Sequence, residues 1–395
     1  MTSVVLPELD GSLRRYVCTV SSDYPATARP ATSRVAYAAA HVVADALGET
    51  TPTGPATLDW DATLAFRHHL WALGLGVAEA MDTAQRGMGL DWALARELVV
   101  RSSVEARSVG GAIAAGAQTD HLAPGSARTL DDVAAAYLEQ CATVEEAGAT
   151  VVVMASRELC RIARDADDYA YVYDKVLGEL ARPAILHWLG GAFDPALAGY
   201  FGSHDVEEAS GCLLGIVDAH PGKVDGVKLS LLDKEWEIVL RGRLPAGVRM
   251  YTGDDFGYPT TIAGDERGHS DALLGAFDFA APAAAWALAA LDGGDVGEFR
   301  RRLDPTLALS RHVFCAPTSY YKTGVVFLAY LNGHQSHFTM VGGLQSGRSV
   351  LHLAQCFRLA DGCGLLADAE LAAARMARLL GLAGIDAARG PGVEK

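Results

Sequence analysis

The chain has 395 residues, half of them hydrophobic and 21% charged, which excludes global disorder and allows a large buried core. The net charge of −15, with no run rich in Lys or Arg, excludes a typical nucleic-acid-binding protein. Seven Cys without a C-x-x-C pair, no stretch like a signal peptide and no apolar segment of membrane length predict a cytoplasmic protein with reduced thiols and no membrane contact.

Apolar, β-branched runs alternate along the chain with amphipathic stretches that carry apolar residues at i, i+3 and i+4. The predicted strands are Tyr16–Val20, Leu75–Ala80, Val109–Ala114, Ala149–Met154, Pro183–Trp188, Val224–Leu229, Val248–Thr252 and Asp271–Ala276. The predicted helices between them include Asp61–Leu73, Asp91–Ser108, Leu130–Ala147, Asp167–Ala181, Asp205–His220 and Lys234–Leu240. After the first strand, strand starts recur about every 25–40 residues, a spacing typical of repeated βα units.

Eight βα units predict an α/β protein, a (β/α)8 TIM barrel with a C-terminal helical extension. An open doubly wound sheet would need a Gly-rich phosphate loop after its first strand, and Ser21–Pro25 has no such pattern. We expect the barrel to span residues 1–281, with an insertion at about 24–58 that is rich in Pro, Thr, Ala and Gly. A helical extension over 282–383 and a flexible tail over 384–395 follow.

Lys228 is the first candidate for catalysis, because catalytic groups of such barrels lie at the C-terminal ends of strands. It lies near the end of the sixth predicted strand, between Val227 and Leu229. A lysine on an apolar inward face tends to lose its proton and then becomes a nucleophile toward carbonyls. The alternative is a lysine that reaches the rim or pairs with a carboxylate.

Polar residues at three other strand ends are further candidates. Asp254 and Asp255 follow the seventh strand and could hold a substrate hydroxyl, orient a lysine or bind a cation, although one of them could equally be a helix cap. His187 on the fifth strand could act as general acid or base, or could be a buried histidine held by hydrogen bonds. Glu79 on the second strand needs a partner in its apolar setting, whether Lys228, another polar group or a metal.

Two groups outside these strand ends could seed a metal site. Asp265, Glu266, His269 and Asp271 cluster before the eighth strand, and His334 lies three residues before His337. Neither spacing is typical of a zinc motif, and polar loops often have this composition. We therefore assign no metal ligands from the sequence.

Several of these segments together resemble the dihydrodipicolinate synthase / N-acetylneuraminate lyase superfamily. The resemblance is carried by Asp168–Tyr173, Ala181–Leu186, Gly226-Val227-Lys228, Gly253-Asp254-Asp255 and Ala316-Pro317…Lys322. It implies a class I aldolase-like barrel in which Lys228 forms a Schiff base, without any other cofactor. It also implies a homodimer or homotetramer.

Two departures from the superfamily concern the substrate. The usual hydroxyl-bearing loop after the second strand reads Gly76–Thr83 here, so that Glu79, Asp82 and Thr83 stand where the family holds a keto-acid carboxylate. His187 aligns with the tyrosine that relays protons in the family. The resemblance therefore implies a small keto-acid or, given these departures, a more hydroxylated keto-sugar.

The combined hypothesis is a lyase for aldol, retro-aldol or dehydration chemistry of such a substrate. Lys228 would form the imine and His187 would move the proton, while Glu79, Asp82, Thr83, Asp254 and Asp255 would bind the substrate. One alternative is a metal-dependent sugar lyase, isomerase or epimerase on the same barrel, using a divalent cation. Another is a barrel that binds sugars without catalysis.

Overall fold

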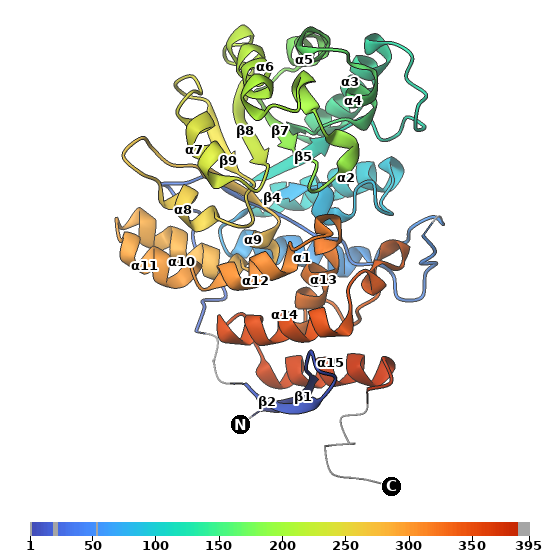
Figure 1. Ribbon diagram of the computed structural model, residues 1–395, viewed down its shortest axis with the longest axis vertical. Helices are drawn as coiled ribbons and strands as arrows, with labels where there is room; N and C mark the ends of the chain where they lie inside the picture. The colour runs from blue at the N-terminus through green and yellow to red at the C-terminus, as the bar shows by residue number, and fades with distance from the viewer. Residues whose placement is uncertain (1, 19–22, 53, 386–395) are drawn as a thin grey trace.

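The structure is a computed structural model that describes residues 2–18, 23–52 and 54–385. Its centre is a closed barrel of eight parallel strands, which confirms the fold predicted from the sequence (Figure 1). The barrel strands are β3 (Ala36–Ala39), β4 (Gly76–Glu79), β5 (Ile113–Ala117), β6 (Thr150–Val153), β7 (Ala184–Leu189), β8 (Val224–Ser230), β9 (Arg249–Thr252) and β10 (Asp271–Leu274). Each pairs with the next, and β10 pairs with β3 to close the ring.

At least one helix follows each barrel strand. These helices are α1 (Trp60–Ala72), α2 (Trp92–Val109), α3 (Leu130–Ala147), α4 (Arg157–Ile162), α5 (Ala166–Glu179), α6 (Val206–Ala219), α7 (Lys234–Arg241), α8 (Tyr258–Ala263) and α9 (Ala276–Phe279), with short 3-10 turns η1 (Asp82–Ala84), η2 (Pro195–Leu197) and η3 (Tyr200–Gly202). Several begin at an aspartate whose side chain accepts a hydrogen bond from the first turn, as at Asp59, Asp91 and Asp205. These caps explain why the sequence located the helix starts well.

The C-terminal part of the chain is helical, as the sequence predicts, and lies below the barrel in Figure 1. It contains α10 (Ala281–Asp292), α11 (Val296–Leu303), α12 (Thr306–Val313), η4 (Thr318–Tyr320), α13 (Tyr321–Leu331), η5 (Val341–Ser346), α14 (Val350–Gly362) and α15 (Ala369–Leu382). Most of the predicted tail, residues 386–395, lies outside the described residues. None of the helices in the described part of the chain has both the length and the apolar character that a membrane span requires.

The prediction of the first strand was wrong. Residues Leu13–Val17 form β2, which pairs antiparallel with β1 (Ser3–Pro7) outside the barrel, and the remainder of Tyr16–Val20 lies largely outside the described residues. The barrel begins instead with β3, inside the segment predicted to be an insertion. The Ala-Tyr-Ala-Ala sequence of β3 has little β-branched character, and it forms a strand because the barrel buries it on both faces.

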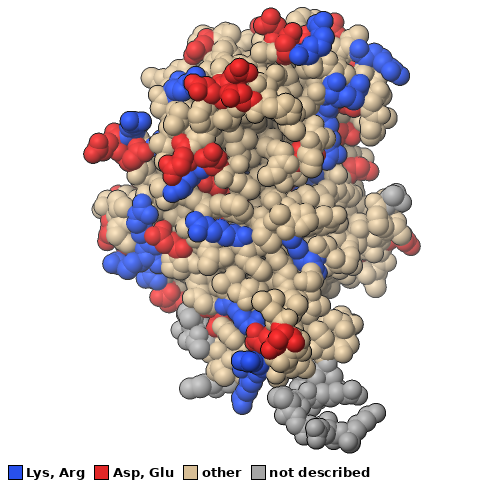
Figure 2. Space-filling model, in the orientation of Figure 1, with Lys and Arg blue, Asp and Glu red and all other residues tan. Residues whose placement is uncertain are grey.

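The interior of the barrel is filled by alternate residues of each strand. Tyr37, Ala78, Val152, Ile185 and Leu273 belong to this inner cluster, separate from the larger core between sheet and helices. The surface in Figure 2 mixes acidic and basic side chains, and the Lys and Arg on this face form no continuous patch. Because the apolar inner cluster fills the middle of the barrel, inward polar side chains can meet at the open end of the barrel.

Candidate active site

A small cavity lies at the C-terminal end of the barrel strands. Residues that follow β4, β7, β9 and β10 line it, together with the end of β8 and the start of α13. Its polar lining consists of Asp82, Thr83, Lys228, Ser230, Asp255 and Tyr321. The cavity therefore occupies the position where barrel enzymes carry out their chemistry.

Lys228 points into this cavity from the sixth barrel strand. In the sheet it lies in register with His187 on β7 and Tyr251 on β9, and only 7% of it is exposed. Burial lowers the pKa of the Lys228 amine, while the charges of Asp82 and Asp255 partly oppose the shift. Among the described residues no group forms a hydrogen bond or ion pair with this amine. A lysine in this setting has its lone pair available to a ligand more often than one at the surface.

The two aspartates after β9 have different surroundings. Asp255 lines the cavity, and its Oδ1 accepts a hydrogen bond from the backbone N–H of Ala276 at 2.9 Å. Burial raises the pKa of Asp255 to about 8, although the charge of Lys228 opposes this. Asp254 does not line the cavity, and its Oδ1 accepts from the backbone N–H of Phe256 at 2.8 Å, as a turn residue does. The structure thus brings Asp255 to Lys228 and gives Asp254 a role in the local backbone.

Asp82 and Thr83 reach the cavity from η1, directly after β4. The hydroxyl groups of Thr83 and Tyr321 are 2.8 Å apart, and the ring of Tyr321 stacks on Phe314 with centroids 4.3 Å apart. Tyr321 was not among the residues predicted from the sequence. The only signal near it was the segment Ala316-Pro317…Lys322, whose resemblance indicated the lysine rather than the tyrosine. A hydroxyl pair held between the second barrel strand and the C-terminal helices can donate and accept protons at the cavity wall.

His187 lies beside Lys228 but one layer behind the cavity wall. It is fully buried, and its Nε2 is 3.2 Å from the hydroxyl of Ser230, which does line the cavity. Burial, and then the charge of Lys228, hold the pKa of His187 well below its usual range. The imidazole is therefore neutral at physiological pH, and any proton that it exchanges with a ligand has to pass through Ser230.

The structure does not bring Glu79 to the cavity, which corrects the substrate-binding role expected from the sequence. Its side chain points outward from β4, where its two carboxylate oxygens accept hydrogen bonds from the guanidinium of Arg67, each at 2.8 Å. The hydroxyl of Ser102 donates to the same carboxylate at 2.6 Å. Arg67 and Glu79 have no exposed side-chain surface. The partner that Glu79 needs is thus an arginine on α1 and not Lys228.

A second, larger cavity adjoins the first, because Asp82 and Leu189 line both. Arg157 lines the second cavity and forms an ion pair of 2.5 Å with Asp194, with 57% of its side chain exposed. The larger cavity therefore extends the Lys228 cavity with a lining of mixed charge, in which Arg86 and Arg157 lie beside the carboxylates of Asp120, Glu158 and Asp194.

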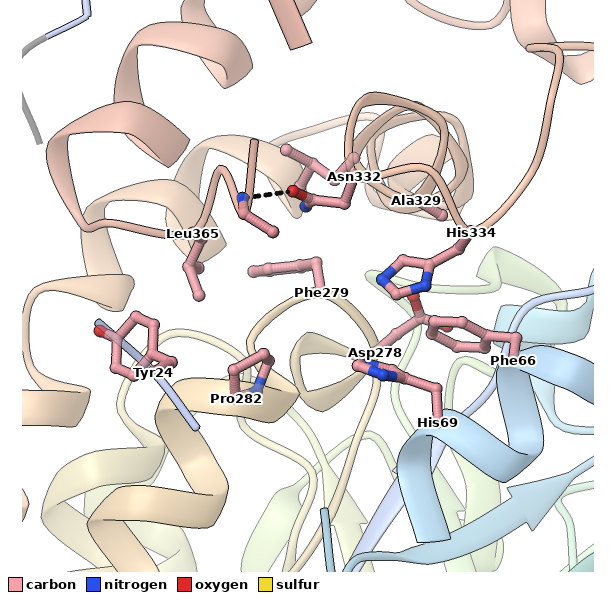
Figure 3. A pocket seen from close by; sticks show the side chains of 12 residues that line it. Tyr24, Phe66, His69, Asp278, Phe279, Pro282, Ala329, Asn332, His334 and Leu365 are labelled. Atoms are coloured by element: carbon pink, nitrogen blue, oxygen red, sulfur yellow. Dashed lines mark hydrogen bonds between the residues drawn. The ribbon is translucent and has the colours of Figure 1, made fainter. Parts of the chain in front are cut away.

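A third cavity, of about 480 Å3, is formed by residues of α1, α9 and the C-terminal helices (Figure 3). Most of its lining is apolar, and the rings of His69 and His334 face each other with centroids 4.4 Å apart. Burial lowers the pKa of His334 to about 3, so that its ring stays neutral. His41 adjoins the cavity through a hydrogen bond of 2.8 Å between its Nδ1 and Asp278. Among the candidate residues discussed from the sequence, His334 lines this cavity, whereas Lys228 and the other residues assigned to the active site do not.

The chain matches one protein family and is similar to several solved structures. A family model described as a protein of unknown function (DUF993) matches residues 4–385. No curated protein matches the chain. Similar solved structures include dihydrodipicolinate synthase from Aquifex aeolicus, with 13% identity and a TM-score of 0.63 over 84% of this chain and 99% of that chain.

Two further structures are similar to the same degree. The dihydrodipicolinate synthase from Acinetobacter baumannii, in complex with pyruvate, has 12% identity and a TM-score of 0.63 over 85% of this chain and 100% of that one. The enzyme from Thermotoga maritima has 12% identity and a TM-score of 0.62 with the same coverage. At this identity the likeness concerns the fold, and at that level it confirms the resemblance predicted from the sequence.

Proposed function

We propose that this chain, which belongs to the DUF993 family of proteins of unknown function, is a lyase whose Lys228 forms an imine with a carbonyl substrate. The observation that carries the proposal is the Lys228 amine itself, buried at the end of the sixth barrel strand with a lowered pKa and facing a polar cavity. The fold shared with dihydrodipicolinate synthases, one of them in complex with the ketone pyruvate, supports it.

Imine formation needs a nucleophile and an acid, and the cavity offers both. The neutral Lys228 amine adds to the carbonyl carbon, and a proton moves from nitrogen to oxygen to give a carbinolamine. Protonated Asp255 then donates its proton to the hydroxyl, which leaves as water, and the nitrogen lone pair forms the C=N bond. The product is an iminium cation beside an Asp255 carboxylate, so that charge is balanced within the buried site.

The iminium group withdraws electrons from the neighbouring carbon and so allows a C–C or C–O bond beside it to break. This second step needs a proton acceptor or donor near that carbon. The hydroxyl pair of Thr83 and Tyr321 reaches the cavity directly, whereas His187 acts through Ser230. We assign the proton transfer to Tyr321 and Thr83, with His187 as the group that orients Ser230.

The polar lining also bears on the substrate class. Asp82 offers acceptor oxygens and repels an anionic group, so we propose that it binds substrate hydroxyls close to the carbonyl. An anionic end of the substrate would instead lie in the adjoining cavity, where it would bind Arg157 in place of that residue's partner Asp194. A compact keto-sugar, or a hydroxylated keto-acid with its carboxylate away from the carbonyl, fits both requirements.

Borohydride trapping tests the proposal. The protein is incubated with pyruvate, hydroxylated keto-acids and keto-sugars in turn, reduced, and examined by intact mass and peptide mapping. We expect at least one compound to give a stable adduct on Lys228. Lys322 is the matched internal control, because burial lowers its pKa to about 8 but its amine donates to the Ser319 carbonyl at 3.1 Å and does not line the cavity.

Three outcomes would contradict the proposal. One is a compound that is turned over without any adduct on Lys228, and a second is an adduct that maps to Lys322 instead. The third is turnover that a Lys228→Ala variant retains. Turnover that a chelator abolishes while no adduct forms would indicate the metal-dependent alternative, and binding without turnover or adduct would indicate a non-catalytic barrel.

A further inference from the structure

Three side chains of types that bind zinc in proteins lie together in the C-terminal helical part, away from the Lys228 cavity. His312 on α12 and His352 and Cys356 on α14 place one potential ligand atom each within 4.8 Å of one another. None of the three lines the cavity around Lys228. We propose that they bind a divalent zinc-like metal ion, which joins α12 to α14.

The ligand types and their spacing fit such an ion. Zinc takes imidazole nitrogens at about 2.0–2.1 Å and thiolate sulfurs at about 2.3 Å, so tetrahedral ligands lie roughly 3.5 Å apart. The rings of His312 and His352 are stacked, with centroids 4.1 Å apart, so metal binding requires one imidazole to turn until its lone pair meets the ion. His352 and Cys356 are four residues apart on one helix and therefore share a face. Pairing residues from two helices is how a metal ion holds a local structure together.

The hydrogen bonds of the two imidazoles also favour a ligand. The Nε2 of His312 donates to the backbone carbonyl of His352 at 3.0 Å, which leaves the lone pair on Nδ1. A hydrogen bond from the second ring nitrogen to a carbonyl is the usual way in which proteins orient a metal-binding histidine. The Nε2 of His352 is buried without a hydrogen-bond partner among the described residues. A metal ion would satisfy this nitrogen.

Cys315 adds a further thiol to the surroundings of these side chains, and Arg348 adds a positive charge that opposes cation binding. Cys315 follows α12 three residues after His312, and its backbone N–H donates to the His312 carbonyl at 3.4 Å. Arg348 is fixed nearby, where its guanidinium donates to the carbonyl of Cys315 at 2.6 Å. Cys356 loses its proton on metal binding, and the thiolate neutralises one of the two charges of the ion.

Such an ion would fix a segment that reaches the candidate active site. Phe314 lies directly after α12, and it stacks on Tyr321, which lines the Lys228 cavity. The inference does not depend on the proposed lyase activity, because it concerns helices outside the cavity. It predicts that metal removal lowers the thermal stability of the full-length protein.

Cobalt substitution tests the inference. The full-length protein is purified, stripped with chelator and titrated with Co2+, and the thiolate-to-cobalt charge-transfer band in the near ultraviolet is recorded. We expect the band to saturate at one equivalent, Zn2+ to remove it by competition, and the melting temperature to rise on binding. Cys356→Ser should abolish the band, whereas Cys363→Ser, at a buried thiol outside the group, should retain it.

A second variant keeps the test valid if Cys356→Ser fails to fold. His352→Ala changes a half-buried residue and should weaken Co2+ binding by at least about tenfold, with an unchanged circular dichroism spectrum. The inference is overturned if the wild-type protein shows no charge-transfer band with excess Co2+. It is equally overturned if His352→Ala or Cys356→Ser binds Co2+ as tightly as the wild type.

Discussion

Replacing Glu79 by Ala should strongly destabilise the protein, because it leaves the guanidinium of Arg67 buried without its counter-ion. Arg67 donates to both carboxylate oxygens of Glu79 and also to the backbone carbonyl of Thr63 at 3.0 Å. Neither side chain of the pair has any exposed surface. No water can therefore replace the carboxylate without opening the layer between β4 and helices α1 and α2.

The magnitude follows from the burial. Removing one partner of a buried ion pair costs about 3–5 kcal/mol, since the remaining charge stays desolvated. The hydroxyl of Ser102 loses its acceptor as well, which adds about 1 kcal/mol. Replacing both charged residues with apolar ones, as in Glu79→Leu/Arg67→Met, should restore most of the loss because no unpaired charge remains.

Urea unfolding of the wild type, the single variant and the double variant measures these differences, and borohydride trapping of each reports on the cavity. Ser103→Ala is a matched control, because Ser103 is buried on the same helix as Ser102 without touching Glu79. A loss below about 1 kcal/mol in Glu79→Ala would refute the reasoning. So would a stably folded Glu79→Ala variant that no longer forms the Lys228 adduct, since Glu79 would then act on the substrate.

Two further predictions concern the cavity. Because burial raises the pKa of Asp255 from 3.8 to about 8, the carboxyl is protonated at pH 7 and loses its proton as the pH rises through about 8, so the rate of adduct formation should fall there. Asp255→Asn should slow adduct formation at pH 7 by about 10²–10⁴-fold and abolish that fall, and a fall that persists in the variant would contradict the assignment. Tyr321→Phe should leave the adduct on Lys228 but lower turnover by about 10²-fold or more. Tyr320→Phe, outside the cavity, should leave turnover unchanged. Equal turnover in the two variants would exclude Tyr321 from proton transfer.

The barrel could be predicted from the sequence because helix caps and apolar runs repeat with the βα period. The first barrel strand could not be predicted, because strand propensity favours the wrong segment. Tyr16 and Val17 have strong strand propensity, yet they belong to a hairpin, while β3 consists mostly of alanine. Burial on both faces makes β3 a strand, and that burial depends on the other seven strands.

A site residue could be predicted from the sequence where its side-chain type is unusual for the element that contains it. Lys228 stands out because a lysine is rare within an apolar strand. Glu79 stands out for the same reason, but which face it occupies could not be read, because helices bury the outer face of β4 as fully as the barrel buries the inner face. Tyr321 gave no signal, because an aromatic residue in a helix is usually part of the core.

The spacing of the proposed metal ligands, in contrast, was present in the sequence. His352 and Cys356 are four residues apart, and His312 lies forty residues before His352. A search for paired cysteines alone does not find them. Only the packing of α12 against α14 shows that His312 faces His352 and Cys356.

The hairpin β1–β2 has a consequence for how the chain is synthesised. Its apolar residues Val4 and Leu6 are buried against helices at the far end of the sequence, and the hydroxyl of Tyr16 donates to Asp361 on α14 at 2.8 Å. The ribosome makes the hairpin before the barrel but makes α14 and α15 after it. The hairpin therefore stays without its docking surface throughout translation of the barrel, and a chain that stops before Val350 exposes it as an open edge for aggregation.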